Sequence, residues 1–522
     1  MQFMAYAFLV LSVLPISAFS FQSHSNSSLL PKYIDEYSIP TPQSGPLAIT
    51  VDLHGVVWFT ESNASKLSRF DPTTGTFREY PVPGAGDMWG ITVDGQGYVW
   101  CTLAAGKGSV NPGGQFTPGG PGRLLRFNPT DSTFSFVDLP LGSFPMRIIT
   151  DRQGQVWFTE FLGNRIGVFN QLTHQLWEYT VPSNASGPAD LTFDQQGTLW
   201  FTEAYGRKLA KFYPENHTFV EYSFEPPYIV PHVLEEFVPV LSPVGLGVSR
   251  DGHVWFADHG GNWIGEFQPK IQNLVRYPTH TPPKDVYVSS IPNGLLVDVE
   301  GRVWFTEHLG NSIAFFDPAT RTMIEYSIPT GPVSGALWLA IAPDQNVWFA
   351  EWNTNKLGIL HSATRVPFSL SSQQKTLRLQ ESAQFSFPIS IESSQKISND
   401  LILRSSWSSF NPTKDIAVKF DPEEVTTGSA DTLAQVQVKL SDTVNSGNYT
   451  LGLGIDAGIV RVWSMIEVQV VASSHPEAPN HFNDYVVSTV IIAGAVLFLI
   501  VIMNRRRRKV RRSESRHNRF SR

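Results

Sequence analysis

The stretch Val57-Trp58-Phe59-Thr60-Glu61 decides the fold, because six close variants of it follow along the chain. The variants are VWCTL at Val99–Leu103, VWFTE at Val156–Glu160, LWFTE at Leu199–Glu203, VWFAD at Val254–Asp258, VWFTE at Val303–Glu307 and VWFAE at Val347–Glu351. Their tryptophans lie 42 to 57 residues apart, and a repeat of about 40–50 residues built of short strands and turns is typical of a β-propeller. We therefore predict an all-β chain with a seven-bladed β-propeller over residues 33–361.

The first repeat shows the four strands of one blade. Residues rich in Val, Ile, Phe and Tyr alternate with Gly, Asn, Asp and Pro at the joints, which predicts strands at 46–52, 56–61, 66–71 and 76–83. The seventh repeat has no fourth strand, yet residues 36–40 (EYSIP) carry a copy of the fourth-strand motif ahead of the first blade. We expect this copy to complete the last blade, which would close the ring and protect its strand edges.

A second β region follows the repeats. Residues 366–472 are rich in Ser, Thr and Val, with predicted strands at 384–391, 416–420, 432–440, 448–455 and 460–471. The passage Phe420-Asp421-Pro422 and the later Gly447-Asn448-Tyr449-Thr450-Leu451 resemble bacterial immunoglobulin-like modules. A β-sandwich of about 100 residues fits this segment, and a spacer or adhesive role is the simplest interpretation.

Both chain ends predict targeting to a membrane. Residues 1–20 carry no charged side chain and end on small residues, which predicts a secretory signal peptide, with an uncleaved anchor as the alternative. A polar stalk at 473–484 precedes an uncharged segment at 485–503, about long enough to span a bilayer, and a basic tail at 504–522. Positive residues stay inside. We expect a single-pass protein of a prokaryotic cell surface with its bulk outside and its C-terminus inside.

Charge and cysteine content limit the partners. The tail holds ten Lys or Arg and one Glu against a net charge of −7 for the whole chain, so the exported part is strongly acidic. This argues against nucleic-acid binding and favours cations or neutral ligands, while the tail suits anionic lipids. Cys101 is the only cysteine, which excludes an internal disulfide and suggests a buried thiol. Five sequons are candidate N-glycosylation sites: Asn26, Asn63, Asn184, Asn216 and Asn448.

An acid follows the motif tryptophan by three residues in six of the seven repeats. The six are Glu61, Glu160, Glu203, Asp258, Glu307 and Glu351, and Leu103 takes this place in the second repeat. We expect them at one end of the central channel. In a structural interpretation each accepts hydrogen bonds within its own blade. In a functional one some of them gather at the channel mouth and hold a cationic ligand or a hard divalent cation, for which Glu307 and Glu351 are the candidates.

The last three repeats break the symmetry most. Asp258-His259 and Glu307-His308 pair an acid with an imidazole and are the candidate catalytic residues. The candidate ligand-binding residues are Asn293, Glu351, Trp352, Glu61, Glu160 and Glu203. Neighbouring residues on a strand face opposite sides, so acid and histidine share the axis only if the strand has ended; surface histidines are the alternative. Insertions at 104–122 and 224–242 are predicted to shape access to this end.

The repeated pattern GPLAITVD, GVVWFTE, KLSRFDP and FREYPVP resembles the streptogramin B lyase (virginiamycin B lyase) family over about residues 33–361. The resemblance implies a seven-bladed propeller that opens a cyclic depsipeptide by eliminating its ester C–O bond, with a magnesium ion and acid–base histidines. The positions of those histidines hold Asn293 and Leu337 here, a family glutamate position holds Gly335, and Glu351 matches a family acid. Asparagine cannot act as a base at neutral pH, and leucine offers no acid–base group.

Three function hypotheses follow. The first is binding of a surface ligand, glycan, peptide or cation at the acidic channel mouth without chemistry. The second is a divergent metal-dependent C–O lyase or hydrolase that acts on a cyclic ester or lactone. The third is a structural component of the cell envelope.

Overall fold

The computed structural model describes residues 30–84, 86–104, 109–110, 116–117, 121–224, 241–279, 290–394, 401–408, 416–425, 432–442 and 444–471. All of them fall within one compact unit, Met1–Val471. Every regular element in these ranges is a β-strand, and none of the residues described forms a helix able to cross a bilayer. The predicted segments 1–20, 473–484, 485–503 and 504–522 lie outside the described residues, as do 225–240 and most of 104–122.

Each motif tryptophan lies in the second strand of a four-stranded antiparallel arrangement, which we number sheets 1 to 7 in the order of the tryptophans. Sheets 1 to 4 are β2–β5 (Pro46–Val51, Val57–Glu61, Lys66–Asp71, Thr76–Pro81), β6, β7, β10 and β11 (Met88–Val93, Val99–Leu103, Pro121–Asn128, Thr133–Leu141), β12–β15 (Pro145–Thr150, Val156–Glu160, Arg165–Asn170, Gln175–Thr180) and β16–β19 (Pro188–Phe193, Leu199–Glu203, Lys208–Tyr213, Thr218–Ser223). Sheets 5 to 7 are β20–β23 (Pro243–Val248, Val254–Asp258, Trp263–Gln268, Asn273–Pro278), β24–β27 (Pro292–Val297, Val303–Glu307, Ser312–Asp317, Thr322–Ser327) and β28–β30 (Ala336–Ile341, Val347–Glu351, Lys356–Leu360) with β1 (Ile34–Ser38). Two short strands, β8 (Ser109–Val110) and β9 (Phe116–Thr117), pair with each other.

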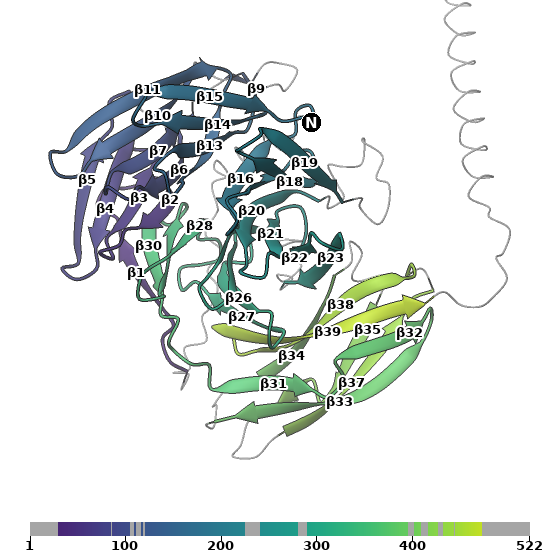
Figure 1. Cartoon of the computed structure of the whole chain (residues 1–522). Helices are drawn as coiled ribbons and strands as arrows, with labels where there is room; N and C mark the ends of the chain where they lie inside the picture. Colours follow the sequence, from purple (N-terminus) through teal and green to yellow (C-terminus); the bar gives the residue numbers. More distant parts are fainter. Residues whose placement is uncertain are drawn as a thin grey trace, which may run out of the picture. The chain divides into compact units, whose positions relative to one another are not determined.

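The sheets form a closed ring around one axis (Figure 1). The first strands of successive sheets contact one another in the order β2, β6, β12, β16, β20, β24 and β28, and β28 contacts β2 again. The last sheet is completed by β1, which pairs with β30 and sets Glu36 opposite Gly358. The predicted β-propeller is therefore confirmed, and the closing strand expected at 36–40 lies at Ile34–Ser38.

An aspartate six residues before the tryptophan organises the first turn of most sheets. In sheet 1 the Asp52 carboxylate accepts hydrogen bonds from the backbone N–H of His54 and Val56 and from Trp58 Nε1, the last at 3.2 Å. The same indole contact recurs at Trp100, Trp157, Trp200 and Trp304. Because the carboxylate satisfies the indole N–H, the tryptophan can be almost fully buried, and Trp58 is 2 % exposed.

In five of the seven sheets a threonine two residues after the tryptophan ties the sheet to the next one, whereas sheets 5 and 7 have Ala257 and Ala350 at this position. The first strand of sheet 1 shifts register between Pro46 and Ile49, and Thr60 Oγ1 accepts the Ala48 N–H there at 3.0 Å. The same hydroxyl donates to Met88 O of sheet 2 at 3.2 Å. Equivalent bonds to the following sheet are made by Thr102, Thr159, Thr202 and Thr306. The recurring motif therefore provides five of the seven joints of the ring.

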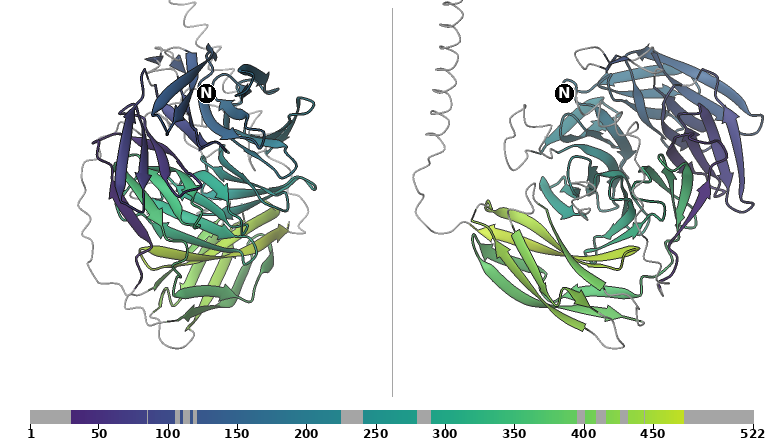
Figure 2. Two further views of the ribbon diagram at one scale, coloured as in Figure 1. Left: turned by 60° about the vertical axis from the view of Figure 1, so that its left-hand side comes forward. Right: turned by 180° about the vertical axis from the view of Figure 1, so that it is seen from behind.

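The second β region is a sandwich that continues one sheet of the ring (Figure 2). One layer is β31 (Phe368–Ser372), β33 (Gln384–Ser393), β37 (Thr432–Leu440) and β35 (Ile416–Asp421). The other contains β32 (Thr376–Gln380), β34 (Leu401–Trp407), β36 (Glu424–Val425), β38 (Gly447–Asp456) and β39 (Val460–Val471). All five predicted strands are present. Strand β39 pairs antiparallel with β27, so that Met323 lies opposite Trp463 and one sheet of nine strands runs through both regions.

A partly buried arginine completes this joint. In three sheets a lysine of the third strand pairs with a glutamate of the outer strand: Lys66–Glu79, Lys208–Glu221 and Lys356–Glu36. Sheet 6 has Ser312 where the lysine stands in those sheets. Arg461 of β39 instead approaches Glu325 at 3.9 Å and Asp456 at 3.3 Å. The sandwich thus supplies the cation that the sixth sheet lacks.

Candidate functional site

The six motif acids lie inside the sheets. All six side chains belong to residues that are 0 % exposed. Asp258 Oδ1 accepts the Ser242 N–H at 2.7 Å and the Gly260 N–H at 3.2 Å. Ser68 donates to Glu61, Arg165 to Glu160 and Thr354 to Glu351, each within its own sheet. These are the contacts that the structural interpretation of the motif expects.

Burial changes the charge of these acids. It raises the pKa of Glu203 and Asp258 to about 7 and that of Glu160 and Glu351 to about 8. It also raises the pKa of Glu307 well above its usual value, with a further rise from the charge of nearby Glu325. Carboxyl groups that keep a large share of their protons near neutral pH exert a weak negative field. The axial end is therefore less acidic than the sequence predicts.

The residues next to the acids, four places after each tryptophan, face the axis. In all seven sheets their backbone N–H donates to the carbonyl thirteen places before the tryptophan, as His259 does to Ser242 at 2.9 Å and His308 to Ile291 at 3.0 Å. Ala104, Phe161 and Ala204 of this set pack in one core with Leu47, Met146, Ala189 and Val244, which stand eleven places before their tryptophans. We call these two sets of positions the axial cluster. Alternation along a strand sends each acid sideways and its neighbour inward.

Sheets 5 and 6 place two imidazoles and an amide in the axial cluster. The rings of His259 and His308 lie 6.4 Å apart at an interplanar angle of 83°. Burial lowers the pKa of His259 to about 3, helped by the charge of His308, and burial lowers the pKa of His308 to about 4. Asn293 is 1 % exposed, and its Nδ2 donates to Leu337 O at 2.7 Å. Its Oδ1 accepts no hydrogen bond from the residues that the structure describes.

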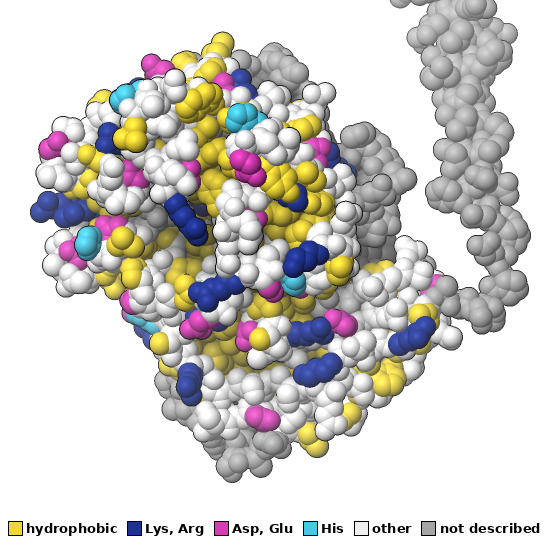
Figure 3. Space-filling model, viewed as in Figure 1, with side chains coloured by type: hydrophobic (Ala, Val, Ile, Leu, Met, Phe, Trp, Pro, Cys, Tyr) yellow, Lys and Arg dark blue, Asp and Glu magenta, His cyan; other side chains and the backbone are white. Residues whose placement is uncertain are grey.

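An arc of aromatic rings from sheets 2 to 4 packs against the axial cluster. Trp89 lies 6.1 Å from Phe144, Phe144 lies 6.5 Å from Phe161, and Phe161 lies 4.8 Å from Tyr205 between ring centroids. Burial raises the pKa of Tyr205 to about 12, so its hydroxyl keeps its proton. Figure 3 shows one face of the whole molecule, with hydrophobic side chains gathered toward its middle.

A network of side chains spans the axis one residue after the first-strand positions of the axial cluster, that is, ten places before the tryptophans. Arg147 Nε pairs with Asp190 Oδ1 at 3.0 Å, and the Arg147 guanidinium lies 4.0 Å from the ring centre of Trp338 in sheet 7. Asp190 Oδ2 accepts the Leu246 N–H of sheet 5 at 3.0 Å. Sequence reasoning missed this network. The available signal was that the same position holds only Ala or Gly in the other four sheets: Ala48, Gly90, Gly245 and Gly294.

The residues present do not fit the magnesium ion that the family resemblance implies. Within the described ranges, no three His, Cys, Asp or Glu side chains are grouped so that they could hold a metal ion. Glu307 and Glu351 belong to different sheets, and the charged groups nearest Glu307 are Glu325 and Arg461. A guanidinium beside a candidate ligand opposes cation binding. Of the predicted site residues, only Asn293, His259, His308 and Trp352 occupy axial positions.

Comparison with known proteins agrees with this fold. The family model of the virginiamycin B lyase family matches residues 31–235 and 115–374, which together are more than half of the chain. A solved streptogramin B lyase is 26 % identical over 63 % of this chain and 97 % of its own, with a TM-score of 0.52. The virginiamycin B lyase of Staphylococcus aureus, also solved as an inactive histidine-to-alanine variant with quinupristin, is 24 % identical over 64 % of this chain and 99 % of its own, with a TM-score of 0.51. No curated protein matches. The chain belongs to the virginiamycin B lyase family.

Proposed function

We propose that the axial cluster binds an uncharged, peptide-like ligand without chemical conversion. The observation that carries the proposal is Asn293 Oδ1, a buried oxygen with no donor among the described residues. Leaving such a group without a hydrogen bond costs about 1–3 kcal/mol, and an amide N–H of a ligand would recover that energy. The aromatic arc from Trp89 to Tyr205 would receive apolar side chains of the same ligand.

The charge state of the cluster selects a neutral ligand over a cation. The imidazoles of His259 and His308 are unprotonated at neutral pH because burial lowers their pKa values. Burial raises the pKa values of the neighbouring carboxyl groups, as for Glu307, so that they carry less negative charge at neutral pH. This replaces the cationic ligand expected from the sequence with an uncharged one.

The binding experiment uses the purified full-length chain and probes of stated chemistry. Acetylated and amidated apolar peptides and quinupristin are titrated while tryptophan fluorescence is recorded. We expect saturable binding that Asn293→Leu weakens about tenfold, the effect of losing one hydrogen bond of about 1.4 kcal/mol. Glu61→Gln changes a buried acid whose side chain bonds Ser68 within its own sheet; it is the control and should bind as the wild type does. Equal affinity of the Asn293→Leu variant and the wild type would rule out this site.

A divergent lyase is the second candidate, favoured by the two adjacent unprotonated imidazoles. In such an elimination a base removes a proton from carbon, a C=C bond forms, and the C–O bond breaks with its electron pair on the leaving oxygen. His308 or His259 would be the base. Opening a ring in this way leaves the mass of a cyclic depsipeptide unchanged, whereas hydrolysis adds one water. Mass spectrometry with quinupristin as probe separates the two, and no turnover by the wild type would exclude both.

For the whole chain we propose a seven-bladed propeller and an immunoglobulin-like module, exported and anchored in the membrane by residues 485–503. Four sequon asparagines are exposed and suit an external location: Asn63, Asn184, Asn216 and Asn448. Asn26 lies outside the described residues. Retention in the membrane after carbonate washing, with the propeller open to external protease, would support this arrangement. Release of the protein by the wash would exclude the proposed membrane anchor. A purely structural envelope role remains the outcome if no ligand binds.

A further inference from the structure

Sheet 5 departs from its neighbours at the turns far from the axial cluster. Ser249 stands where Asp52 and its equivalents hold the turn and the tryptophan indole in five other sheets. Opposite Trp255 the third strand carries Glu266. The equivalent residues of sheets 1, 2 and 4 are cations over their tryptophan rings: Arg69, Arg126 and Lys211. Sheet 5 thus replaces a repeated cation by a buried acid.

The buried acid orients a histidine. Glu266 is 7 % exposed and accepts a hydrogen bond from Tyr277 Oη at 2.8 Å. His253 Nδ1 lies 2.6 Å from Glu266 Oε1. A buried carboxylate is costly unless it is well bonded, and here its bonds hold the imidazole in one orientation. With Nδ1 engaged, Nε2 is the ring nitrogen of His253 left for other partners.

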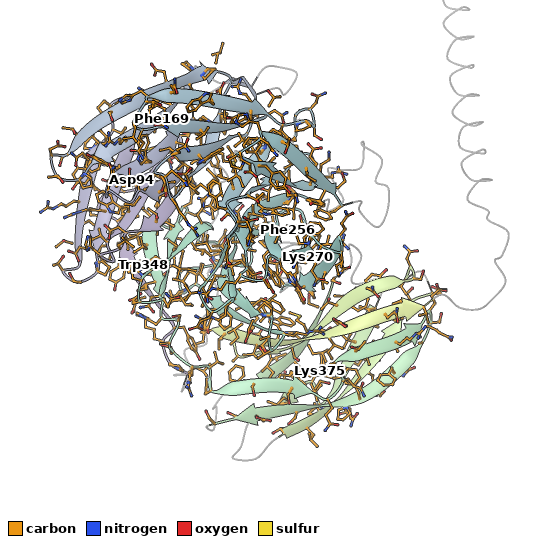
Figure 4. All side chains as sticks on the ribbon, in the orientation of Figure 1. Asp94, Phe169, Phe256, Lys270, Trp348 and Lys375 are labelled. Carbon is orange, nitrogen blue, oxygen red and sulfur yellow. The ribbon has the colours of Figure 1, made fainter. Side chains whose placement is uncertain are left out.

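His253 lines a cleft of about 430 Å³ between sheets 4 and 5. The cleft is formed by three turns, after β16, after β20 and after β22, and Figure 4 labels Lys270 on the last of them. The side chain of His253 is 32 % exposed. The other polar or charged residues that line the cleft include Asp194, Gln195, Gln196, Arg250, Asp251, Gln268 and Lys270.

The cleft lacks a side-chain bridge that closes another junction of the ring. Between sheets 2 and 3 the side chain of Gln171 donates to Asp94 Oδ2 at 3.3 Å and to Gly154 O at 2.7 Å, which bridges the equivalent turns. The position of Gln171, fourteen places after its tryptophan, is taken by Pro269 in sheet 5, as it is by proline in sheets 1, 4 and 6. Proline has no side-chain donor, so it cannot make this bridge.

The lining balances charge and mixes donors with acceptors. Arg250 and Lys270 oppose Asp194 and Asp251, and the glutamine amides both donate and accept. Asp194 accepts hydrogen bonds from Trp200 Nε1 at 3.1 Å and from the backbone N–H of Gln196 and Thr198, so both of its oxygens already have donors. A hydroxyl group also both donates and accepts. We propose that this cleft binds one unit of a neutral carbohydrate, with its hydroxyl groups on His253, Asp251 and the glutamines.

The test titrates the full-length chain with methyl glucoside, methyl galactoside, methyl mannoside and N-acetylglucosamine, followed by saturation-transfer NMR. We expect weak saturable binding of at least one probe, reduced about tenfold or more in His253→Ala through loss of a hydrogen bond. Pro269→Gln should rebuild the bridge seen at Gln171 and block binding in a folded protein. Gln195→Ala, an exposed change that leaves the Glu266 network intact, should weaken it too.

Two controls separate this site from others. Gln155 is the residue of sheet 3 that is equivalent to His253 of sheet 5. Gln155→Ala should leave the affinity unaltered. Asn293→Leu alters the axial cluster and should also leave sugar binding unaltered, so failure of one proposed site does not imply failure of the other. Absence of saturable binding by the wild type, or wild-type affinity in both His253→Ala and Pro269→Gln, would overturn the proposal.

Discussion

At the scale of single residues, the motif acid is a source of pH dependence in stability. Burial raises the pKa of Glu351 from 4.5 to about 8. The folded chain therefore holds this proton more tightly than the unfolded chain, and the resulting stability is full below about pH 4.5 and lost as the pH rises through 8. Glu351→Gln can keep the Thr354 contact without ionising. We expect it to raise the free energy of unfolding by about 1–2 kcal/mol at pH 8 to 9 and to change little at pH 5.

Urea unfolding at both pH values measures this effect. Glu215→Gln, an exposed change, is the control and should leave the pH curve as in the wild type. If Glu351→Gln followed the wild-type curve at every pH, burial would not be the origin of the raised pKa.

The same residue shows the limit of sequence reasoning at this scale. The spacing after each tryptophan correctly marked a repeated acid, but not the direction of its side chain. The direction depends on where the strand ends, and the seven backbone bonds such as His259 N to Ser242 O hold the next residue in the strand's alternation. His259 and His308 therefore reach the axis in place of Asp258 and Glu307. The pairing of Arg147 with Trp338 was equally hidden, because it joins sheets that are far apart in sequence.

At the scale of elements, strand positions were well predicted because local periodicity determines them. β39 spans Val460–Val471, as expected, and β1 supplies the predicted outer strand of the last sheet. The pairing of β39 with β27 was not predicted. Each strand has the sequence of an ordinary edge strand, and the two pair only because the two regions pack together in the folded chain. The cation that joins them, Arg461, has no local signature either.

The threonine joints give a prediction at the same scale. Thr202 Oγ1 accepts the Asp190 N–H at 3.0 Å and donates to Val244 O of the next sheet at 2.9 Å. Thr202→Val keeps the volume and leaves both buried groups without that partner. We expect a loss of about 2–4 kcal/mol in the free energy of unfolding, measured by urea denaturation. Thr192→Val, on a partly exposed position of β16, should change stability by less than about 1 kcal/mol; equal losses in both variants would contradict the role of the joint.

At the scale of the whole molecule, the continuous sheet makes the sandwich part of the propeller's stability. Arg461 is a cation beside Glu325 and Asp456, so Arg461→Ala removes the positive charge next to the buried Glu325 carboxylate. Breaking a buried pair in this way costs about 3–5 kcal/mol. We expect the variant to unfold at a lower urea concentration, with the propeller and the sandwich losing structure together because β27 and β39 share hydrogen bonds.

Arg404→Ala is the matched control for this joint. Its side chain is 48 % exposed and lies 3.9 Å from the same Asp456, and an exposed ion pair contributes only about 0–1 kcal/mol. Tryptophan fluorescence reports largely on the propeller, and far-ultraviolet circular dichroism reports on both regions. Coincident transitions that shift together in Arg461→Ala, but not in Arg404→Ala, are the expected result. A sandwich that melts separately while the propeller keeps its wild-type midpoint would mean that the nine-stranded sheet does not couple the two regions.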